Sequence, residues 1–316
     1  MNSYTINSRL LTTYSAEENP LHFDKTKNYL FDLSYLSALN VQGDKASDFL
    51  QGQLSCEMQD LSDIHMVHGA QCNLKGRILA LLDVVKWNGI QLILPRDLLE
   101  ATQNSLMKTA LLSRVTLTEN SSFKIFGFYL QNPQDIKPHS SFFPEAIQGQ
   151  TYNEQGCYYH LGQNFYILLL KSDYVEPVVS IFKTQQQLFG SLTWHSLRLM
   201  QGQIEIYPES RGLFLPHRLG LHDTSYISFN KGCYKGQEII ARMHYKSTLK
   251  HELKLFEIET DGPLFSGQKV FNAEKNSEIG ELVDYTPLDQ QRFLVAVSIL
   301  KEIEELNHVV WSEKLE

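Results

Sequence analysis

The sequence predicts an α+β protein in which helices and strands alternate before a strand-rich C-terminal region. Hydrophobic residues make up 42% of the 316 residues and charged residues 20%, a balance that supports packed cores. Helical and strand patterns alternate up to residue 248, and only short β-type runs follow. We therefore expect an N-terminal arm at 1–28, a first region at 29–248 and a second at 249–316, with the first element beginning near Tyr29.

Elements in the first half follow from apolar spacing and turn residues. A helix is expected after Gly43, with Asp44 as its N-cap, because apolar residues recur at helical spacing at Ala46, Phe49, Leu50 and Leu54. Asn88-Gly89 separates two apolar runs and predicts a hairpin. Pro95 ends its second strand, and an amphipathic helix follows with apolar positions at Leu98, Leu99, Leu106, Met107, Ala110 and Leu111.

The second half is predicted in the same way. Strands are expected at 115–118, 123–130, 158–161 and 165–170, and helices at 174–188 and 192–201. The segment 132–156 carries three prolines and is expected to be a loop. Short strands at 253–259, 269–272, 279–284, 293–299 and 309–311 favour a small barrel or sandwich, with one helical turn at 301–306.

Charge and cysteine usage exclude several classes of protein. The formal charge of −8 argues against a broad nucleic-acid surface, which would be basic. The four cysteines form no CxxC pair, so they provide neither a disulfide framework nor the ligand spacing of a metal site, and a reducing, cytoplasmic location is expected. No apolar run has membrane-spanning length, and the first twenty residues lack the apolar core of a secretory signal.

The segment Lys231-Gly-Cys-Tyr-Lys-Gly-Gln-Glu238 carries the strongest chemical signal. Cys233 lies on a glycine-flanked turn before a predicted helix, between Lys231 and Lys235. A helix N-terminus and neighbouring cations stabilise a thiolate, which favours a reactive cysteine. The alternative is a buried small residue, and no histidine or acid is tied to Cys233 by proximity in the sequence.

Several segments together resemble the YgfZ-type folate-binding proteins, a family linked to iron–sulfur cluster upkeep and tRNA modification. The resemblance rests on the octet at 231–238, preceded by Phe214-Leu-Pro-His217 and Ile227-Ser-Phe-Asn230. Two further pieces agree in order and spacing, namely Gly43-Asp44 with Phe49-Leu-Gln-Gly-Gln53, and His68-Gly-Ala70 with Cys72 and Lys75-Gly-Arg77. It covers roughly residues 29 to 300, almost the whole chain.

This family is similar in fold to the aminomethyltransferase of the glycine cleavage system. The resemblance implies a three-domain aminomethyltransferase-like ring around a folate-sized hole, with two interleaved α+β subdomains and a C-terminal β-barrel. It implies tetrahydrofolate or a related folate as cofactor, with the pterin against Trp194. Leu36 stands where the family has a second tryptophan, and the neighbouring Tyr35 is a substitute stacking partner.

The remaining site residues come from the motif and from charge. Cys233 and Lys231 are the expected catalytic pair. The carboxylates of the folate tail require cations, for which Arg198, Arg242 and Lys231 are the candidates. The resemblance adds the remaining motif positions to the folate site, which are Gly232, Tyr234, Gln237 and Glu238.

Two departures argue against ordinary aminomethyl transfer. The run that follows Lys75 has no carboxylate before Asp83, and in Arg198-Leu-Met-Gln-Gly202 Met200 stands where the aminomethyltransferases, with an R-x-E-x-G segment, carry the glutamate that holds the pterin. The leading hypothesis is therefore a folate-binding accessory protein that serves iron–sulfur client enzymes or assembly factors, including tRNA-modifying ones, through Cys233. One exposed cysteine provides one of the four thiolates of a resident cluster, so only transient ligation is expected.

Two other functions remain as alternatives. The first is a folate-dependent one-carbon transferase that acts through Cys233. The second is a tRNA-binding adaptor, for which a basic strip would be needed, formed by Lys75, Arg77, Lys246, Lys250 and Lys254. Given the net charge, scattered solvated lysines are favoured over such a strip, and direct tRNA binding is not expected. The sequence gives no oligomeric state.

Overall fold

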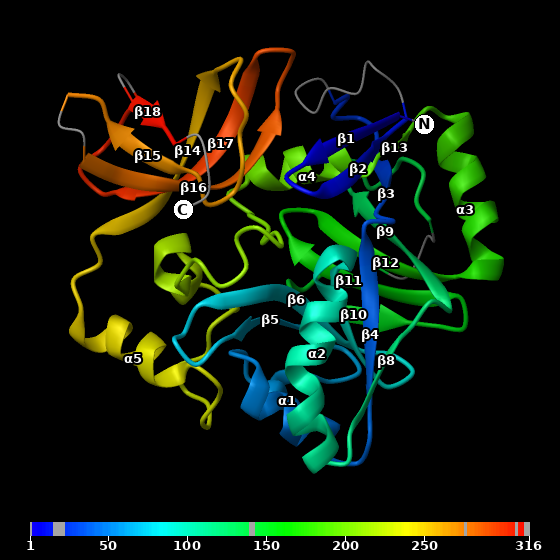
Figure 1. The fold of residues 1–316 in the computed structure, drawn as a ribbon. Helices are drawn as coiled ribbons and strands as arrows, with labels where there is room; N and C mark the ends of the chain where they lie inside the picture. The colour runs from blue at the N-terminus through cyan, green and yellow to red at the C-terminus, as the bar shows by residue number, and fades with distance from the viewer. Residues whose placement is uncertain (1, 15–22, 139–142, 275–276, 307–308, 313–316) are drawn as a thin grey trace.

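The computed structural model describes residues 2–14, 23–138, 143–274, 277–306 and 309–312, and it is an α+β fold as predicted (Figure 1). The described residues contain five α-helices. These are α1 (Ala46–Gln53), α2 (Arg96–Leu112), α3 (Ser172–Thr184), α4 (Ser191–Met200) and α5 (Gln237–Lys246). Three short 3-10 helices accompany them, η2 (Met58–Asp60), η3 (Pro216–Leu219) and η4 (Leu221–Asp223).

Two sheets, interleaved along the sequence, form the larger part of the molecule; the first contains one parallel pair, and the second is antiparallel throughout. One sheet has the order β10 (Gln150–Tyr152), β11 (Gly156–Gly162), β12 (Phe165–Lys171), β9 (Phe123–Tyr129), β3 (Tyr29–Asp32) and β13 (Leu188–Phe189). The other has the order β5 (Val67–Cys72), β6 (Ile78–Lys86), β7 (Ile90–Pro95), β4 (Leu36–Gln42) and β8 (Thr116–Glu119). The hairpin predicted from Asn88-Gly89 is the β6–β7 pair, with Lys86 opposite Ile90.

All described strands beyond residue 248 belong to one C-terminal sheet. Its order is β14 (His251–Glu259), β17 (Arg292–Leu300), β16 (Ser277–Pro287), β15 (Lys269–Asn272) and β18 (Val309–Trp311). Every predicted strand of this region is present, whereas residues 301–306 form a turn rather than a helical segment. Within the described residues β14 and β18 do not pair with each other, so the sheet is not a closed barrel. The domain boundary at residue 248 stays a prediction.

The N-terminal segment corrects the sequence analysis, which placed the first element near Tyr29. β1 (Asn2–Ile6) and β2 (Arg9–Thr13) form an antiparallel hairpin. Ile6 and Leu11 are fully buried and belong to the same hydrophobic cluster as α4 and the C-terminal sheet. Alternation of exposed and buried residues over only five positions per strand was too short to be recognised in the sequence.

Four smaller expectations were also wrong. Asp44 does not cap α1, because the N-cap position is Lys45 and no side chain bonds the helix start. Met107 and Leu111 are 43% and 71% exposed, so the buried face of α2 is narrower than predicted. The predicted loop at 132–156 includes β10, and the predicted helix at 174–188 ends at Thr184 because Leu188 pairs with Leu30 in β13.

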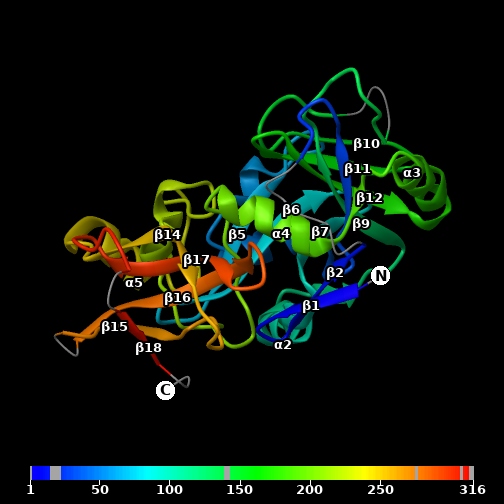
Figure 2. The ribbon, with the colours of Figure 1, turned by 90° about the horizontal axis from the view of Figure 1, so that it is seen from above.

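Helix α4 connects the parts of the molecule. It packs against β2 of the hairpin, β3 of the six-stranded sheet, and β16 and β17 of the C-terminal sheet (Figure 2). His195 on α4 lies 3.2 Å from the carboxylate of Asp284 on β16, and both side chains are buried. The Asp284 carboxylate also accepts bonds from the Tyr207 hydroxyl at 2.6 Å and the Glu205 amide at 2.8 Å. α4 and the chain that follows it are thereby held to the C-terminal sheet.

Candidate functional site

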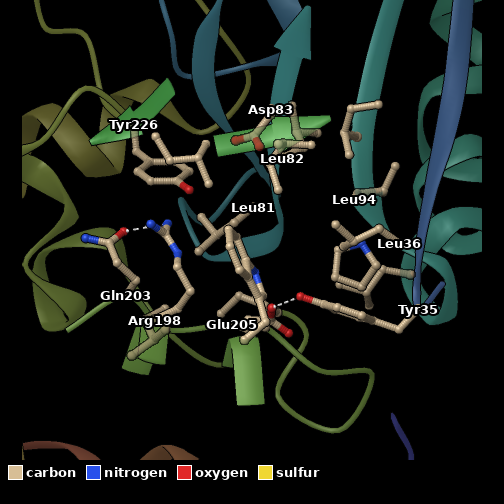
Figure 3. Close-up of a pocket in the computed structure, with 18 residues that line it drawn as sticks. Tyr35, Leu36, Leu81, Leu82, Asp83, Leu94, Arg198, Gln203, Glu205 and Tyr226 are labelled. Atoms are coloured by element: carbon tan, nitrogen blue, oxygen red, sulfur yellow. Dashed lines mark hydrogen bonds between the residues drawn. The ribbon is translucent and has the colours of Figure 1, made fainter. Parts of the chain in front are cut away.

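A central cavity lies between the six-stranded sheet, the five-stranded sheet that contains β6 and β7, and the chain that leaves α4. Its volume is about 90 Å³, small beside the roughly 300–1,000 Å³ of pockets that enclose drug-sized ligands. A folate would therefore place only one end in it. The residues around it are Tyr35, Leu36, Leu81, Leu82, Asp83, Ile93, Leu94, Pro95, Leu98, Leu161, Ile167, Trp194, Arg198, Gln203, Ile204, Glu205, Ile206 and Tyr226 (Figure 3).

Four predicted folate contacts, distant in sequence, meet at this cavity. Tyr35 and Leu36 come from the start of β4, and Trp194 and Arg198 lie one turn apart on α4. Trp194 is only 3% exposed. Its indole packs against Gly127, where a Cβ would lie 2.5 Å from the ring, and against Phe31 and Phe165 with ring centroids 5.4 and 5.3 Å away. Trp194 is therefore a core residue that also borders the cavity.

Arg198 places a poorly partnered cation in the cavity. Among the described residues its guanidinium makes one long hydrogen bond, from Nη2 to Oε1 of Gln203 at 3.4 Å. It also lies over the rings of Phe165 and Trp194, with 5.4 and 5.9 Å to the centroids. Burial lowers the pKa of Arg198 despite the charges of nearby acidic groups. An arginine in this setting gains from a ligand oxygen that accepts its protons.

Two carboxylates that the sequence analysis did not assign to the site also line the cavity. Asp83 accepts from Tyr159 at 3.0 Å and lies 2.7 Å from Nδ1 of His68. Glu205 accepts the Tyr35 hydroxyl at 2.6 Å. Burial, and then the charge of Glu205, raise the pKa of Tyr35 well above its usual value, so this phenol remains a donor. No local motif marks either acid, because their partners lie far away in the sequence.

The motif around Cys233 forms a second centre, built by three segments that carry the family resemblance. The Lys231 ammonium donates to the carbonyl oxygens of Gln51, Leu54 and Cys56 at 2.8, 2.7 and 2.5 Å. The Lys235 amide donates to the carbonyl of Gly52 at 3.1 Å. The Lys231–Glu238 motif is thus fixed to the end of α1 and the residues that follow it.

Gly236 joins this motif to the turn between β5 and β6. Its φ is +89°, and an added Cβ would lie 2.5 Å from the carbonyl oxygen of Asn73 and 3.1 Å from the Cα of Gly76. Only glycine permits both this left-handed conformation and this approach. The segment with Lys75, Gly76 and Arg77 is therefore packed directly against the start of α5.

The structure separates the two predicted groups of site residues. None of the motif positions lines the cavity. Cys233, Gly232 and Glu238 are exposed, as is Arg242 on α5, whereas Tyr234 is buried and Gln237 is partly buried. Lys231 is buried, and burial lowers its pKa to about 8 although nearby Cys56 and Glu57 oppose the shift. The three hydrogen bonds to carbonyl oxygens hold the Lys231 side chain in place, and its catalytic role stays a prediction.

Cys233 is expected to react with iodoacetamide at pH 8 at least 100-fold faster than the other three cysteines. Cys56, Cys72 and Cys157 are buried, and burial raises the pKa of each thiol to about 12, so roughly 10⁻⁴ of each is thiolate at pH 8. Mass spectrometry of alkylated peptides measures the four rates, and labelling in denaturant, where all four should react alike, is the control. Equal rates in the folded protein would contradict the expectation.

Three further observations concern metal binding, membrane-spanning helices and the basic strip considered for tRNA binding. Within the residues that the structure describes, no three His, Cys, Asp or Glu side chains gather in a way that would hold a metal ion. No helix in the described part of the chain has the length and apolar character of a membrane span. In the proposed basic strip, Lys254 is paired with Glu252 and Glu304, and Arg77 donates to the carbonyl of Leu213.

Known proteins resemble the chain in both sequence and fold. It is 24% identical over 260 residues to the tRNA-modifying protein YgfZ of Colwellia psychrerythraea, covering 81% of this chain and 80% of that protein. It is 27% identical to the tRNA-modifying protein YgfZ of Klebsiella pneumoniae, covering 71% and 70%. No protein-family model matches it. The glycine cleavage system aminomethyltransferase T of Bartonella henselae shares the fold with a TM-score of 0.67 at 15% identity, over 87% of this chain and 80% of that one.

Proposed function

We propose that this chain, a YgfZ-type protein with an aminomethyltransferase-like fold, binds tetrahydrofolate in the central cavity and uses Cys233 to support iron–sulfur enzymes, including those that modify tRNA. The observation that carries the proposal is the meeting of Tyr35, Trp194 and Arg198 around one cavity. Aromatic and apolar walls with a few polar groups suit a flat heteroaromatic ring.

Residues that line the cavity can be matched to the parts of a bound folate. The apolar wall formed by Leu36, Ile93 and Leu94 would cover one part of the ring, and the hydroxyl of Tyr226 adds a polar group. Arg198 offers protons to a ring oxygen, and the glutamate tail would extend out of the cavity. When bound, tetrahydrofolate supplies a carrier for one-carbon groups.

The position of Cys233 favours an accessory role over the alternative of one-carbon transfer through this thiol. A nucleophile for transfer from folate has to approach the reactive nitrogens of the bound cofactor. Cys233 instead lies exposed on its turn and does not line the cavity. An exposed thiol on a rigid turn is suited to transient contact with a partner protein, and we propose iron–sulfur client enzymes or assembly factors as those partners.

Binding of tetrahydrofolate tests the proposal directly. We expect a dissociation constant in the micromolar range by isothermal titration calorimetry, about 8 kcal/mol of binding free energy. Arg198→Gln should weaken binding by at least 10-fold because it removes the cation from the cavity. Arg292→Gln, an exposed arginine of the C-terminal sheet that does not line the cavity, is the matched control and should leave the affinity unchanged.

Two outcomes would overturn parts of the proposal. Absence of tetrahydrofolate binding, or equal effects of the two arginine variants, would remove the central cavity as a folate site. Turnover of a folate one-carbon donor that Cys233→Ser abolishes would replace the accessory role with the transferase.

A further inference from the structure

Glu205 is a carboxylate that lines the cavity, and it lies close in the sequence to a position where this chain lacks a glutamate of the aminomethyltransferases. Met200 occupies the position at which the aminomethyltransferases that the chain resembles carry the glutamate that holds the pterin. Helix α4 ends at Met200, and the chain then turns through Gly202, whose φ is +73°, toward the cavity. Glu205 reaches the cavity wall together with Arg198 and Gln203 (Figure 3). The fold therefore supplies an acid to this cavity from five residues further along the chain.

A buried arginine from the N-terminal hairpin holds Glu205 in place. Arg9 is 3% exposed, and its Nη1 donates to Oε2 of Glu205. Its other nitrogens donate to both carboxylate oxygens of Asp97 at 2.8 and 2.9 Å and to the carbonyl of Ile206 at 2.8 Å. The Glu205 side chain is 21% exposed. Arg9 is therefore buried between two partly exposed carboxylates, because the Asp97 side chain is 23% exposed, and of these two acids only Glu205 lines the cavity.

The bonding capacity of Glu205 is only partly used. An ionised carboxylate accepts about four hydrogen bonds. Among the described residues its side chain accepts one from Tyr35 and is paired with Arg9. Arg9 serves two carboxylates with a single positive charge, so negative charge remains on the pair. The Glu205 carboxylate can therefore accept further hydrogen bonds, and its negative charge favours a ligand that carries two adjacent N–H donors.

We infer that Glu205 binds the donor edge of the pterin ring, which carries a ring N–H beside an amino group, and that Arg9 is its positioning residue. The inference rests on the proposed binding of folate in this cavity. Two parallel donors match the two oxygens of a carboxylate, as in arginine–carboxylate pairs. Specificity for a 2-amino pterin over a ring without that amino group would then come from Glu205, and the N-terminal hairpin becomes part of the binding site.

A comparison of two ligands across variants tests the inference. The ligands are tetrahydrofolate and its 2-desamino analogue, measured by calorimetry under reducing conditions. The wild-type protein should prefer tetrahydrofolate by at least 10-fold, and Glu205→Gln, of the same size, should lower the affinity for tetrahydrofolate about 10- to 100-fold and remove the preference. Arg9→Gln should reduce the preference. Asp97→Asn, which leaves the Arg9–Glu205 pair intact, should keep it.

Each outcome separates this inference from the proposed function. Tetrahydrofolate binding with an undiminished preference in Glu205→Gln would overturn the inference and leave the proposed function standing. No binding of tetrahydrofolate by the wild-type protein would overturn both. A lower melting temperature in Arg9→Gln with an unchanged preference would make Arg9 structural only. If Arg9→Gln does not fold, Arg9→Lys, which keeps the charge but not the forked contacts, should show the reduced preference.

Discussion

Replacing Asp284 with alanine is expected to lower the free energy of unfolding by about 3–5 kcal/mol. The carboxylate is fully buried and is shared by His195, the hydroxyl of Tyr207 and the amide of Glu205. Its removal leaves a buried imidazole without its counter-charge and a buried phenol without its acceptor. The contact between α4 and the C-terminal sheet should therefore weaken more than for an ordinary surface substitution.

The pH dependence of unfolding shows whether the stability lost in Asp284→Ala comes from the charge pair with His195 or only from the cavity left by the smaller side chain. Burial lowers the pKa of His195, but the Asp284 carboxylate outweighs it and raises the pKa to about 9, against an ordinary value of 6.5. A raised histidine pKa stabilises the fold fully below about pH 6.5, and the stabilisation is lost as pH rises through about 9. Urea unfolding of the wild type should show this decline, about 3 kcal/mol at most, and Asp284→Ala should not.

A matched control for this variant lies in the same sheet region. Asp289→Ala removes an exposed carboxylate paired with Arg292, so unfolding should change little and the pH dependence should remain. Equal losses in the two variants, or an unchanged pH dependence in Asp284→Ala, would show that the buried carboxylate does not stabilise the contact between α4 and β16.

Replacing Gly236 with alanine should separate the two candidate centres. The new methyl group would lie 2.5 Å from the Asn73 carbonyl oxygen, in a left-handed conformation with φ of +89°. Backbone atoms on both sides cannot move aside as a side chain would, so the free energy of unfolding is expected to fall by about 2–4 kcal/mol. The Cys233 turn should then detach from the β5–β6 turn. The rate of Cys233 alkylation should change, while the proposed binding of tetrahydrofolate should keep its affinity, because Gly236 does not line the cavity.

Gly232 in the same turn provides the control for Gly236. An added Cβ at Gly232 would meet no heavy atom within 4 Å, so Gly232→Ala should be close to neutral in unfolding and in alkylation rate. The two alanine variants are compared by urea unfolding and by the rate of Cys233 labelling. A neutral Gly236→Ala would show that the close approach to Asn73 is not required.

The sequence predicts features that depend on neighbouring residues and misses those that depend on distant partners. Asn88-Gly89 located a hairpin because its two strands adjoin, and the strands beyond residue 248 were identified by their regular spacing. The family resemblance indicated Trp194 and the search for a cation indicated Arg198; both line one cavity, and their roles in folate binding stay predictions. The sequence did not indicate Glu205, because its partner Arg9 is 196 residues away, in the segment 1–28 that was expected to be an N-terminal arm.

The placement of the Lys231 ammonium has a consequence for the order of folding. It bonds carbonyls of residues up to 180 positions earlier in the chain, including Gln51 and Cys56. At about 5–20 residues per second, a ribosome makes those acceptors roughly 10–35 s before the lysine emerges. Until then, the carbonyl oxygens of Gln51, Leu54 and Cys56 are without this donor. The Cys233 turn is thus expected to become fixed to the end of α1 only after residue 231 has been made, while the strands of the C-terminal sheet follow it in the chain.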